Sequence, residues 1–480
     1  MKNIIKFQLG LAAFGVLAVV LAGFSNKVFA STNEITEPFG IFRITTGGRH
    51  VLSGKHEGQI IIEAARSDVV ELVLDGFHLH NPNGPAIFAP RSRKVELILA
   101  DGTINTISDG RHPNNETNAA IYIQHELLIS GSGTLKVHGN FHHGIRTQNF
   151  FTINSGTIEV TAVGDALRGR DGVIIEDGTF SLTAGGDGIQ SNRASDPERG
   201  FVTINGGRFI IAAGDDGIQA ESRITINDGT FSITAHDDGI TTNGSVFIHG
   251  GNINIIDSYE GIEGLNVTIT GGDIKIFARD DGINARCGEI SPVAHHRNVS
   301  RAPANENIYV RITGGNIHIH ALGDGIDSNN NIFLEGGTVY ISGPSSGREG
   351  AVDHEGIFLI TGGELVTAGS VRSISSQSTQ ASLIVAYGRQ LPGGTLIEVR
   401  NSRGCTLLKH VAQNAFSMST FTSVNFAIGQ TYALYINGEK TGGITLTGIV
   451  TTIGGNSVNR GFANARGGGR LNQQTPPRSR

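Results

Sequence analysis

An acid-Gly-Ile motif returns at nearly constant spacing along the middle of this 480-residue chain, and that spacing constrains the fold more than any other feature. Successive copies are 22, 22, 29, 22, 22, 21 and 43 residues apart, and the two long steps contain insertions at 193–200 and 287–307. A turn-Gly motif such as Asn227-Asp228-Gly229 interleaves with the first. A fixed period indicates a solenoid of stacked units. The apolar residues of the first motif are Ile145, Leu167, Ile189, Ile218, Ile240, Ile262, Ile283 and Ile326.

Each repeat is predicted to form three short strands separated by turns. Apolar and polar residues alternate over 231–235, as expected of a strand with one buried face. Glycines and Asn-Gly pairs between such runs suit turns with positive φ. Three strands and three turns in ~22 residues make one coil of a parallel β-helix. Leucine-rich repeats would need a helical segment, and propeller blades a Trp-Asp signature, whereas this chain has no Trp.

The composition agrees with a strand-rich chain. Gly contributes 68 residues and Pro only 12, so Gly is about twice its ordinary share. The excess does not follow the three-residue period of collagen. With 38% hydrophobic and 17% charged residues, general disorder is not expected. The formal net charge of −6 argues against a nucleic-acid partner.

The first thirty residues are predicted to be a signal peptide. Lys2 and Lys6 precede an apolar run at 9–24, and Val28-Phe29-Ala30 fits a cleavage site after Ala30. We therefore expect a secreted, extracellular or cell-surface protein. No later apolar run reaches the ~18 residues of a membrane span, so no membrane partner is expected after cleavage.

The remaining chain divides where the repeat stops. Strand-like runs at 383–387, 396–400 and 432–436 predict a small antiparallel β module that caps the solenoid. Beyond it the Gly/Arg-rich tail has no periodic pattern and is predicted to be disordered. The predicted parts are a signal peptide at 1–30, a parallel β-helix at 31–375, the β module at 376–455 and the tail at 456–480.

Acidic residues occupy one register position in most repeats, directly before the Gly of the first motif. This column contains His143, Asp165, Asp187, Asp216, Asp238, Glu260, Asp281 and Asp324. Coils of a β-helix stack ~4.8 Å apart, and adjacent full charges at that spacing repel by about 3.5 kcal/mol at an effective dielectric near 20. Cations, protonation, hydrogen bonds of the turns or splayed side chains must offset this repulsion.

Bound Ca²⁺ is the interpretation we favour, because this ion takes six to eight oxygen ligands from carboxylates and carbonyls. Asn192, Asn243, Asn284 and Asp327 follow in the same turns and could complete the ligand shells. The alternative is that Asp before Gly is good turn chemistry, with its carboxylate accepting nearby backbone N–H groups. The predicted metal ligands are Asp187, Asp215, Asp216, Asp237, Asp238, Glu260, Asp280, Asp281 and Asp324.

The Asp-Asp-Gly-Ile and Thr-Gly-Gly-x-Ile-x-Ile repeats, with 118–122 and 130–135 upstream, resemble a bacterial secreted carbohydrate-binding β-helix family. That family is polysaccharide-lyase-like in fold and binds calcium, cellulose and acidic sugars. The resemblance covers about residues 35–450. It implies a right-handed parallel β-helix, calcium at the Asp-rich turns and a plant cell-wall or acidic polysaccharide as partner. The chain departs from the pattern at Ala166, His142-His143 and Tyr259-Glu260.

We therefore predict a non-catalytic polysaccharide-binding protein that recognises acidic, pectin-like or other cell-wall glycans. The absence of Trp and the presence of only seven Tyr favour ionic recognition over stacking on neutral glucan. One alternative is a calcium-dependent polysaccharide lyase, with Arg146, Arg168 or Lys275 as the base. We interpret those three as solvated strand residues. Another alternative is a structural or adhesive cell-surface solenoid.

Overall fold

The computed structural model describes residues 30–31, 39–112, 116–286, 307–344 and 349–454. The predicted signal peptide (except Ala30), the predicted tail and the insertion at 287–306 lie outside the described residues. All regular secondary structure in the described part is strand, which confirms the all-β prediction. Within the described ranges there is no helix with the length and apolarity of a membrane-crossing segment.

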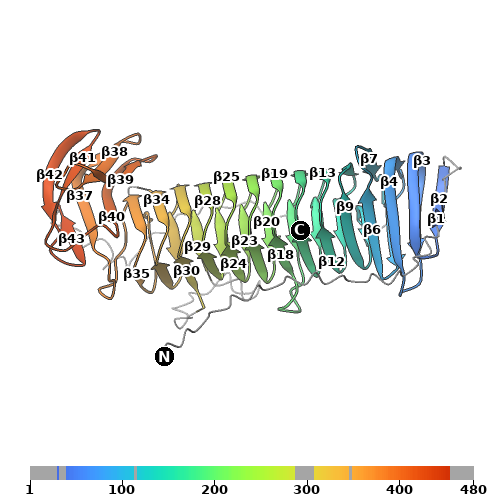
Figure 1. Cartoon of the computed structure of the whole chain (residues 1–480), viewed down its shortest axis with the longest axis horizontal. Helices are drawn as coiled ribbons and strands as arrows, with labels where there is room; N and C mark the ends of the chain where they lie inside the picture. Colours follow the sequence, from blue (N-terminus) through green and yellow to red (C-terminus); the bar gives the residue numbers. More distant parts are fainter. Residues whose placement is uncertain (1–29, 32–38, 113–115, 287–306, 345–348, 455–480) are drawn as a thin grey trace, which may run out of the picture.

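The strands form an elongated solenoid in which each repeat contributes one strand to each of three rows (Figure 1). From β5 to β31, each strand of a row pairs in parallel with the strand three places further along the chain, so that Ile145 lies beside Leu167 and Leu167 beside Ile189. In the last coil the spacing is two, because β33 pairs with β35 and β34 with β36. This long, mostly parallel sheet is the predicted stacking of repeats.

The first row follows the turn-Gly motif and holds the longest strands, which run over about six residues. Its members are β7 (Ile104–Ser108), β10 (Thr134–Gly139), β13 (Thr157–Ala162), β16 (Thr179–Ala184), β19 (Arg208–Ala213), β22 (Thr230–Ala235), β25 (Asn252–Ser258), β28 (Asp273–Ala278), β31 (Asn316–Ala321), β34 (Thr338–Ser342) and β36 (Glu364–Ala368).

The second row follows the acid-Gly motif and holds the shortest strands. Its members are β5 (Ile87–Arg91), β8 (Ala119–Ile123), β11 (His143–Thr147), β14 (Leu167–Gly169), β17 (Ile189–Ser191), β20 (Ile218–Ala220), β23 (Ile240–Thr242), β26 (Ile262–Gly264), β29 (Ile283–Ala285) and β32 (Ile326–Ser328).

The third row closes each coil. Its members are β6 (Lys94–Leu99), β9 (Glu126–Gly131), β12 (Phe150–Ile153), β15 (Gly172–Ile175), β18 (Phe201–Ile204), β21 (Arg223–Ile226), β24 (Ser245–Ile248), β27 (Asn266–Ile269), β30 (Tyr309–Ile312), β33 (Asn331–Leu334) and β35 (Phe358–Ile360).

Different strands occupy the two ends. At the N-terminal end, β1 (Ala30–Ser31), β2 (Phe39–Ile44), β3 (Gly48–Glu63) and β4 (Val69–His80) precede the rows, and β3 and β4 are longer than any strand of the rows. At the C-terminal end lie β37 (Ser382–Leu391), β38 (Leu396–Arg400), β39 (Thr406–Val411), β40 (Phe416–Thr422), β41 (Thr431–Ile436), β42 (Glu439–Thr445) and β43 (Val450–Ile453). Four of these form an antiparallel sheet in the order β39-β38-β41-β42.

The core is a set of ladders of like side chains. The apolar residues of the acid-Gly-Ile motif are all buried and lie in register from β11 to β32. Phe180, Phe209 and Phe231 stack with ring centroids 4.5 and 4.6 Å apart. Because side chains of a strand alternate between faces, the alternating pattern of each repeat places these ladders inside.

The two recurrent glycines have different structural causes. Gly229, in the turn-Gly motif, has a φ of +129°, which L side chains rarely adopt. Gly217, in the acid-Gly motif, does not have positive φ, but a Cβ there would lie 2.5 Å from the carbonyl oxygen of Gly239. Only the first position therefore follows the positive-φ explanation, while the second is required by the close approach of neighbouring coils.

Candidate metal centre in the stacked acidic turns

The turns between first-row and second-row strands bring the predicted acidic residues into one line. We call Asp165, Asp187, Asp216, Asp238, Glu260, Asp281 and Asp324 the acidic column. From Asp165 to Glu260, an oxygen of each carboxylate accepts the backbone N–H of the next member at N···O distances of 3.0 to 3.2 Å. Asp281 accepts the N–H of Asp324 in the same way at 2.6 Å.

In these contacts the carboxylates accept backbone N–H groups, as the alternative to metal binding predicts, with one difference. The N–H donor comes from the next coil and not from the residue's own turn. The backbone carbonyls of the column also bond between coils, since Asp238 O accepts the N–H of Gly217 at 2.8 Å. Asp187, Asp216 and Asp238 are therefore each fixed between two neighbours, and the second oxygen of each carboxylate is not used in this ladder.

Burial and mutual repulsion disfavour ionisation in the middle of the column. Burial, followed by the charges of Asp187 and Asp238, raises the pKa of Asp216 to about 9. Burial and neighbouring carboxylates likewise raise the pKa of Asp238 to about 7 and that of Asp324 to about 8. The hydrogen bonds between coils thus leave much of the repulsion uncompensated.

A second line of side chains runs beside the acidic column, three residues later in each repeat. We call it the flanking column, and register pairs align its members from β11 to β32. The residues change from basic to amide to acidic along the solenoid. They are Arg146, Arg168, Gln190, Gln219, Thr241, Glu263, Asn284 and Asp327.

At the N-terminal end, the flanking column supplies a cation to the acidic column. Nη1 of Arg168 lies 2.9 Å from Oδ2 of Asp165. Burial opposes ionisation of Asp165, but contacts with His143 and Arg168 hold its pKa below the usual value. Burial lowers the pKa of His143 to about 4, and its Nδ1 lies 3.0 Å from the N–H of Asp165. A neutral imidazole therefore replaces a carboxylate as acceptor here.

The expectation that Arg146 and Arg168 are solvated strand residues is wrong. The Arg168 side chain is only 19% exposed and holds the ion pair with Asp165. Arg146 is half-buried, hydrogen-bonds the side chain of Asn118 and lies over the ring of Tyr122. Both arginines point to specific partners because the adjoining turns are packed closely enough to reach them.

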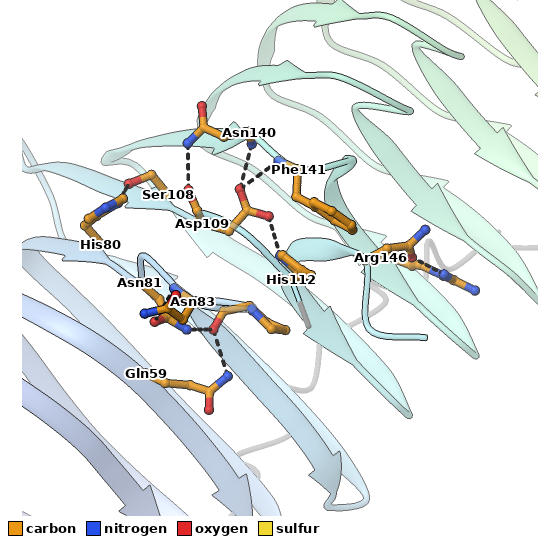
Figure 2. A network of polar contacts seen from close by, with 12 residues as sticks. Gln59, His80, Asn81, Asn83, Ser108, Asp109, His112, Asn140, Phe141 and Arg146 are labelled. Carbon is orange, nitrogen blue, oxygen red and sulfur yellow. Dashed lines mark hydrogen bonds and ion pairs between the residues drawn. The ribbon is translucent and has the colours of Figure 1, made fainter. Parts of the chain in front are cut away.

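The turns before Asp165 hold a polar network of a different kind (Figure 2). Asp109 follows β7 and is fully buried; its Oδ1 accepts the N–H of Asn140 at 2.6 Å, and its Oδ2 lies 2.7 Å from Nε2 of His112. The His112 ring stacks on Phe141 with centroids 4.4 Å apart. The carboxylate of Asp109 is thus satisfied by amide and imidazole groups of the chain itself.

In the middle of the solenoid, amides take the place of the arginines. Gln190 donates to Asp187, and Nδ2 of Asn284 lies 3.2 and 3.1 Å from the two carboxylate oxygens of Glu260. The side-chain oxygens of Gln190, Gln219 and Asn284 are buried, and none has a hydrogen-bond partner in the described part of the chain. Orphaned amide oxygens beside stacked carboxylates form a donor set that suits a hard cation.

Three groups of acids have carboxylate oxygens within 4.8 Å of one another, as expected of possible cation ligands. They are Asp215, Asp216 and Asp237; Asp238, Glu260 and Glu263; and Asp324, Asp327 and Asp353. Six of the nine predicted ligands belong to these groups. Asp187, Asp280 and Asp281 do not belong to a group of three within the described residues.

Two of the four residues expected to complete the ligand shells lie beside the acidic column. Asn284 contacts Glu260 and Asp327 joins Asp324, whereas Asn243 donates to Glu221 at 2.9 Å instead. For Asn192, no contact with the acidic column is observed in the described residues. Sequence reasoning missed Glu263 and Asp353. Their register could have identified them. Glu263 lies three residues after the acid of its repeat, at the position that Arg168 occupies in an earlier repeat, and Asp353 lies in the next coil beside Asp327.

A family described as carbohydrate-binding domain-containing protein matches residues 40–291 and 235–397. A carbohydrate-binding domain-containing protein of Acetivibrio thermocellus is 35% identical over 127 residues, which are 25% of this chain and 44% of that protein. The chain thus spans less than half of this relative's length.

A solved structure is also similar. It is titled as the polysaccharide lyase-like protein from C. thermocellum, gadolinium derivative, and is 32% identical. The match covers 43% of this chain and 87% of that one, with a TM-score of 0.43.

Proposed function

The chain belongs to the carbohydrate-binding domain-containing protein family, and from this premise we propose that it is a non-catalytic polysaccharide-binding protein whose acidic turns hold Ca²⁺. The proposed ligand is an acidic, pectin-like or other cell-wall glycan. The N-terminal motif supports export with cleavage after Ala30. The family resemblance supports a right-handed winding of the coils.

One observation carries the calcium proposal. The middle of the acidic column combines raised pKa values with buried amide oxygens that have no partner among the described residues. A divalent cation would relieve both conditions, because it favours ionised carboxylates and accepts carbonyl oxygens as ligands. The residues proposed to hold it are Asp215, Asp216 and Asp237 in one group, with Asp238, Glu260 and Glu263 in the next.

Calcium also supports the choice of an acidic glycan. The chain carries a formal net charge of −6, so a polyanion would be repelled by the protein as a whole. Cations held at or near the surface reverse that repulsion locally. Asp215 is exposed and Asp237 is half-buried, so an ion bound by this group would lie near solvent.

The test is retention on polygalacturonate and on cellulose, with chelator and with excess Ca²⁺. We expect retention on polygalacturonate that is lost in chelator and restored by Ca²⁺. The variant Asp215→Asn/Asp237→Asn should weaken the Ca²⁺ dependence. Asp228→Asn is the matched control, because Asp228 is an exposed aspartate of a turn outside the acidic groups. Retention on neither polymer would overturn the proposal and favour an adhesive role towards other partners.

A lyase activity is the second candidate, and one observation favours it. Burial and the adjoining charge of Arg168 lower the pKa of Arg146, which lies at the N-terminal end of the flanking column. A lyase needs a base of lowered pKa to remove the proton beside a uronate carboxylate. Incubation with polygalacturonate, monitored by the ultraviolet absorbance of unsaturated products, tests it. Product formation that Arg146→Gln abolishes would replace the non-catalytic proposal.

A further inference from the structure

The outer face of the first row changes character near its C-terminal end. One register position carries Ser232 on β22 and Asn254 on β25, and then Lys275, His318 and Tyr340 on β28, β31 and β34. Short polar side chains are thus replaced by a cation and two rings in three successive coils. Such a change on a solvent-facing strip indicates a local surface function.

The antiparallel sheet at the end of the chain rises beside this strip. In Figure 1, β39 lies at the same end of the molecule as β34. Two adjoining cavities of about 370 and 680 Å³ fill the angle between them. Both are lined by His318, Tyr340, His410 and Gln413, so they form one groove. Each volume lies in the range of ligand-binding clefts.

The groove has a fixed shape because polar contacts join its two walls. Oγ of Ser342 lies 2.8 Å from Nε2 of His410, and the side chain of Asn414 lies 2.9 Å from Nε2 of His320. Nδ2 of Asn414 also donates to the carbonyl of Ala321 at 2.8 Å. The residues that meet here are 68 to 94 positions apart in sequence, so the module is attached to the solenoid at this line.

A ladder of rings crosses the junction. His318 and Tyr340 stack with centroids 4.8 Å apart, and Tyr340 and His410 with centroids 5.7 Å apart. Burial lowers the pKa of His318 and lowers that of His410 to about 4, so both imidazoles are neutral near pH 7. The ring ladder is therefore an uncharged, half-buried floor with hydrogen-bonding edges, a surface that suits sugar rings.

The charged side chains of the groove are dominated by two lysines. Lys275 is exposed on β28 and Lys409 is exposed on β39, and neither forms an ion pair within the described residues. Glu398 also lines the groove, but it is buried and paired with Arg400 at 2.9 Å. Asp273, the other acid near His318, accepts a hydrogen bond from Asn316. Glu364 lies near Tyr340 and accepts a hydrogen bond from Ser423. Among the residues that line the groove, the two lysines are therefore the charged groups without an ion pair in the described part of the chain.

We propose that this groove binds a segment of acidic polysaccharide, with uronate carboxylates on Lys275 and Lys409 and sugar rings over the His318–Tyr340 floor. This assignment rests on the proposed polysaccharide-binding function and gives it a location separate from the acidic turns. Two unpaired ammonium groups facing one cleft are complementary to a polyanion. A neutral glucan would leave both lysines without a partner.

The test is titration of wild-type protein with oligogalacturonate, and of the variants Lys275→Gln, Lys409→Gln and their combination, all in saturating Ca²⁺. A charge-assisted hydrogen bond to a carboxylate is worth about tenfold in affinity. We expect Kd to rise about tenfold for each substitution, and more in the double variant. Lys55→Gln, an exposed lysine outside the groove, is the matched control and should leave Kd unchanged.

A second measurement does not depend on variants. Amine acetylation read by mass spectrometry should show Lys275 and Lys409 protected by oligogalacturonate and Lys55 unprotected. Wild-type binding with unchanged Kd in the double variant and no protection would overturn the groove while leaving the proposed function intact. Absence of wild-type binding to acidic and neutral glycans would overturn the proposed function and the groove with it.

Discussion

The turns between first-row and second-row strands carry buried carboxylates along the solenoid. Their charge is offset in one way at the N-terminal end and in another way in the middle. At the N-terminal end, Asp109 lies against His112, and Asp165 against His143 and Arg168. In the middle, Asp216 and Asp238 lie against other carboxylates and have no ion pair with a basic side chain of the described chain. The hydrogen bonds between coils run from Asp165 through Asp187 and Asp216 in the same way, whereas the flanking column differs between the two halves.

The flanking column therefore determines whether the neighbouring carboxyl of the acidic column is ionised. An arginine three residues after the acid holds the pKa of Asp165 below its usual value. A glutamine or threonine at the equivalent position leaves Asp216 with a pKa of about 9 and Asp238 with one of about 7. Arg168 is the last arginine of the flanking column. Further along the solenoid Arg286 pairs with Glu263, but Asp216 and Asp238 have no basic partner of this kind among the described residues, so compensation of these two acids must come from solution.

Removal of Ca²⁺ should have the largest effect. A site at a thousandfold excess of ion over Kd contributes about 4 kcal/mol to the free energy of unfolding, which corresponds to a shift in Tm of roughly 5 °C for a chain of this size. We expect chelator to lower Tm by that amount and Ca²⁺ to restore it. Equal melting curves in chelator and in excess Ca²⁺ would contradict the metal assignment.

Hydrogen exchange with and without chelator compares the effect of Ca²⁺ on the two halves within one molecule. Chelation should reduce the protection of amides around 214–218 and 236–240, where the carboxylates lack basic partners. The amides around 140–147 serve as the internal control, because His112, His143 and Arg168 remain in place. Equal loss of protection in both regions would remove the distinction between the two halves.

Replacing one acid in each half should give opposite results in chelator. Asp165→Asn leaves the buried Arg168 without its carboxylate, so we expect a loss of about 3 kcal/mol in the free energy of unfolding. Asp216→Asn keeps an oxygen for the N–H of Asp238 and removes the cost of protonating a buried carboxyl on folding, so stability near pH 7 should be unchanged or rise by about 1 kcal/mol. Urea unfolding measures both values. Equal destabilisation by the two variants is the result that would break the comparison.

The pH dependence of the metal-free protein follows from the raised pKa values. Asp187, Asp216 and Asp238 have folded pKa values of about 7, 9 and 7, above the unfolded value near 4. The folded state therefore binds more protons between about pH 4 and pH 9, and stability falls as pH rises through this window. Asp165, with its pKa lowered, contributes in the opposite sense and loses its contribution only as pH falls below about 4.

Melting curves in chelator at pH 5 and pH 8 test this sign. We expect a higher Tm at pH 5 by a few degrees, and a smaller or reversed difference in excess Ca²⁺, since the ion stabilises ionised carboxylates. The control is Asp216→Asn, in which the pH effect should shrink. A metal-free protein that is more stable at pH 8 would show that the central carboxylates are compensated in another way.

The sequence predicted the stacked repeats and the line of acids because both follow from a fixed register. Once the acid-Gly-Ile motifs are aligned, Ile218 must pack beside Ile240 and Asp216 must lie beside Asp238, whatever the details of the coil. The ladder of hydrogen bonds between coils was not predicted. Its geometry depends on how closely the turns approach, which the glycine of the motif permits but a residue pattern does not specify.

The flanking column and the groove were harder to predict for two physical reasons. Members of the flanking column share a position but no chemistry, so Arg168, Thr241 and Glu263 do not form a recognisable motif. The groove joins His318 and Tyr340 to His410, a contact between distant segments that no local periodicity encodes. Lys275 was noticed in the sequence, but its partners across the groove were not.

The smallest expected effect comes from placing an arginine in the flanking column one coil after Arg168. Gln190 lies in register with Arg168 and contacts Asp187, so Gln190→Arg should place a guanidinium where the orphaned amide oxygen now lies. We expect a gain of about 1 kcal/mol in chelator and a smaller stabilisation by Ca²⁺, because a fixed cation would replace part of the ion's role. Gln190→Leu removes the same amide without adding charge and is the matched control. If the arginine and leucine variants respond alike to Ca²⁺, charge in the flanking column does not govern the acidic turns, and the contrast between the two halves has another cause.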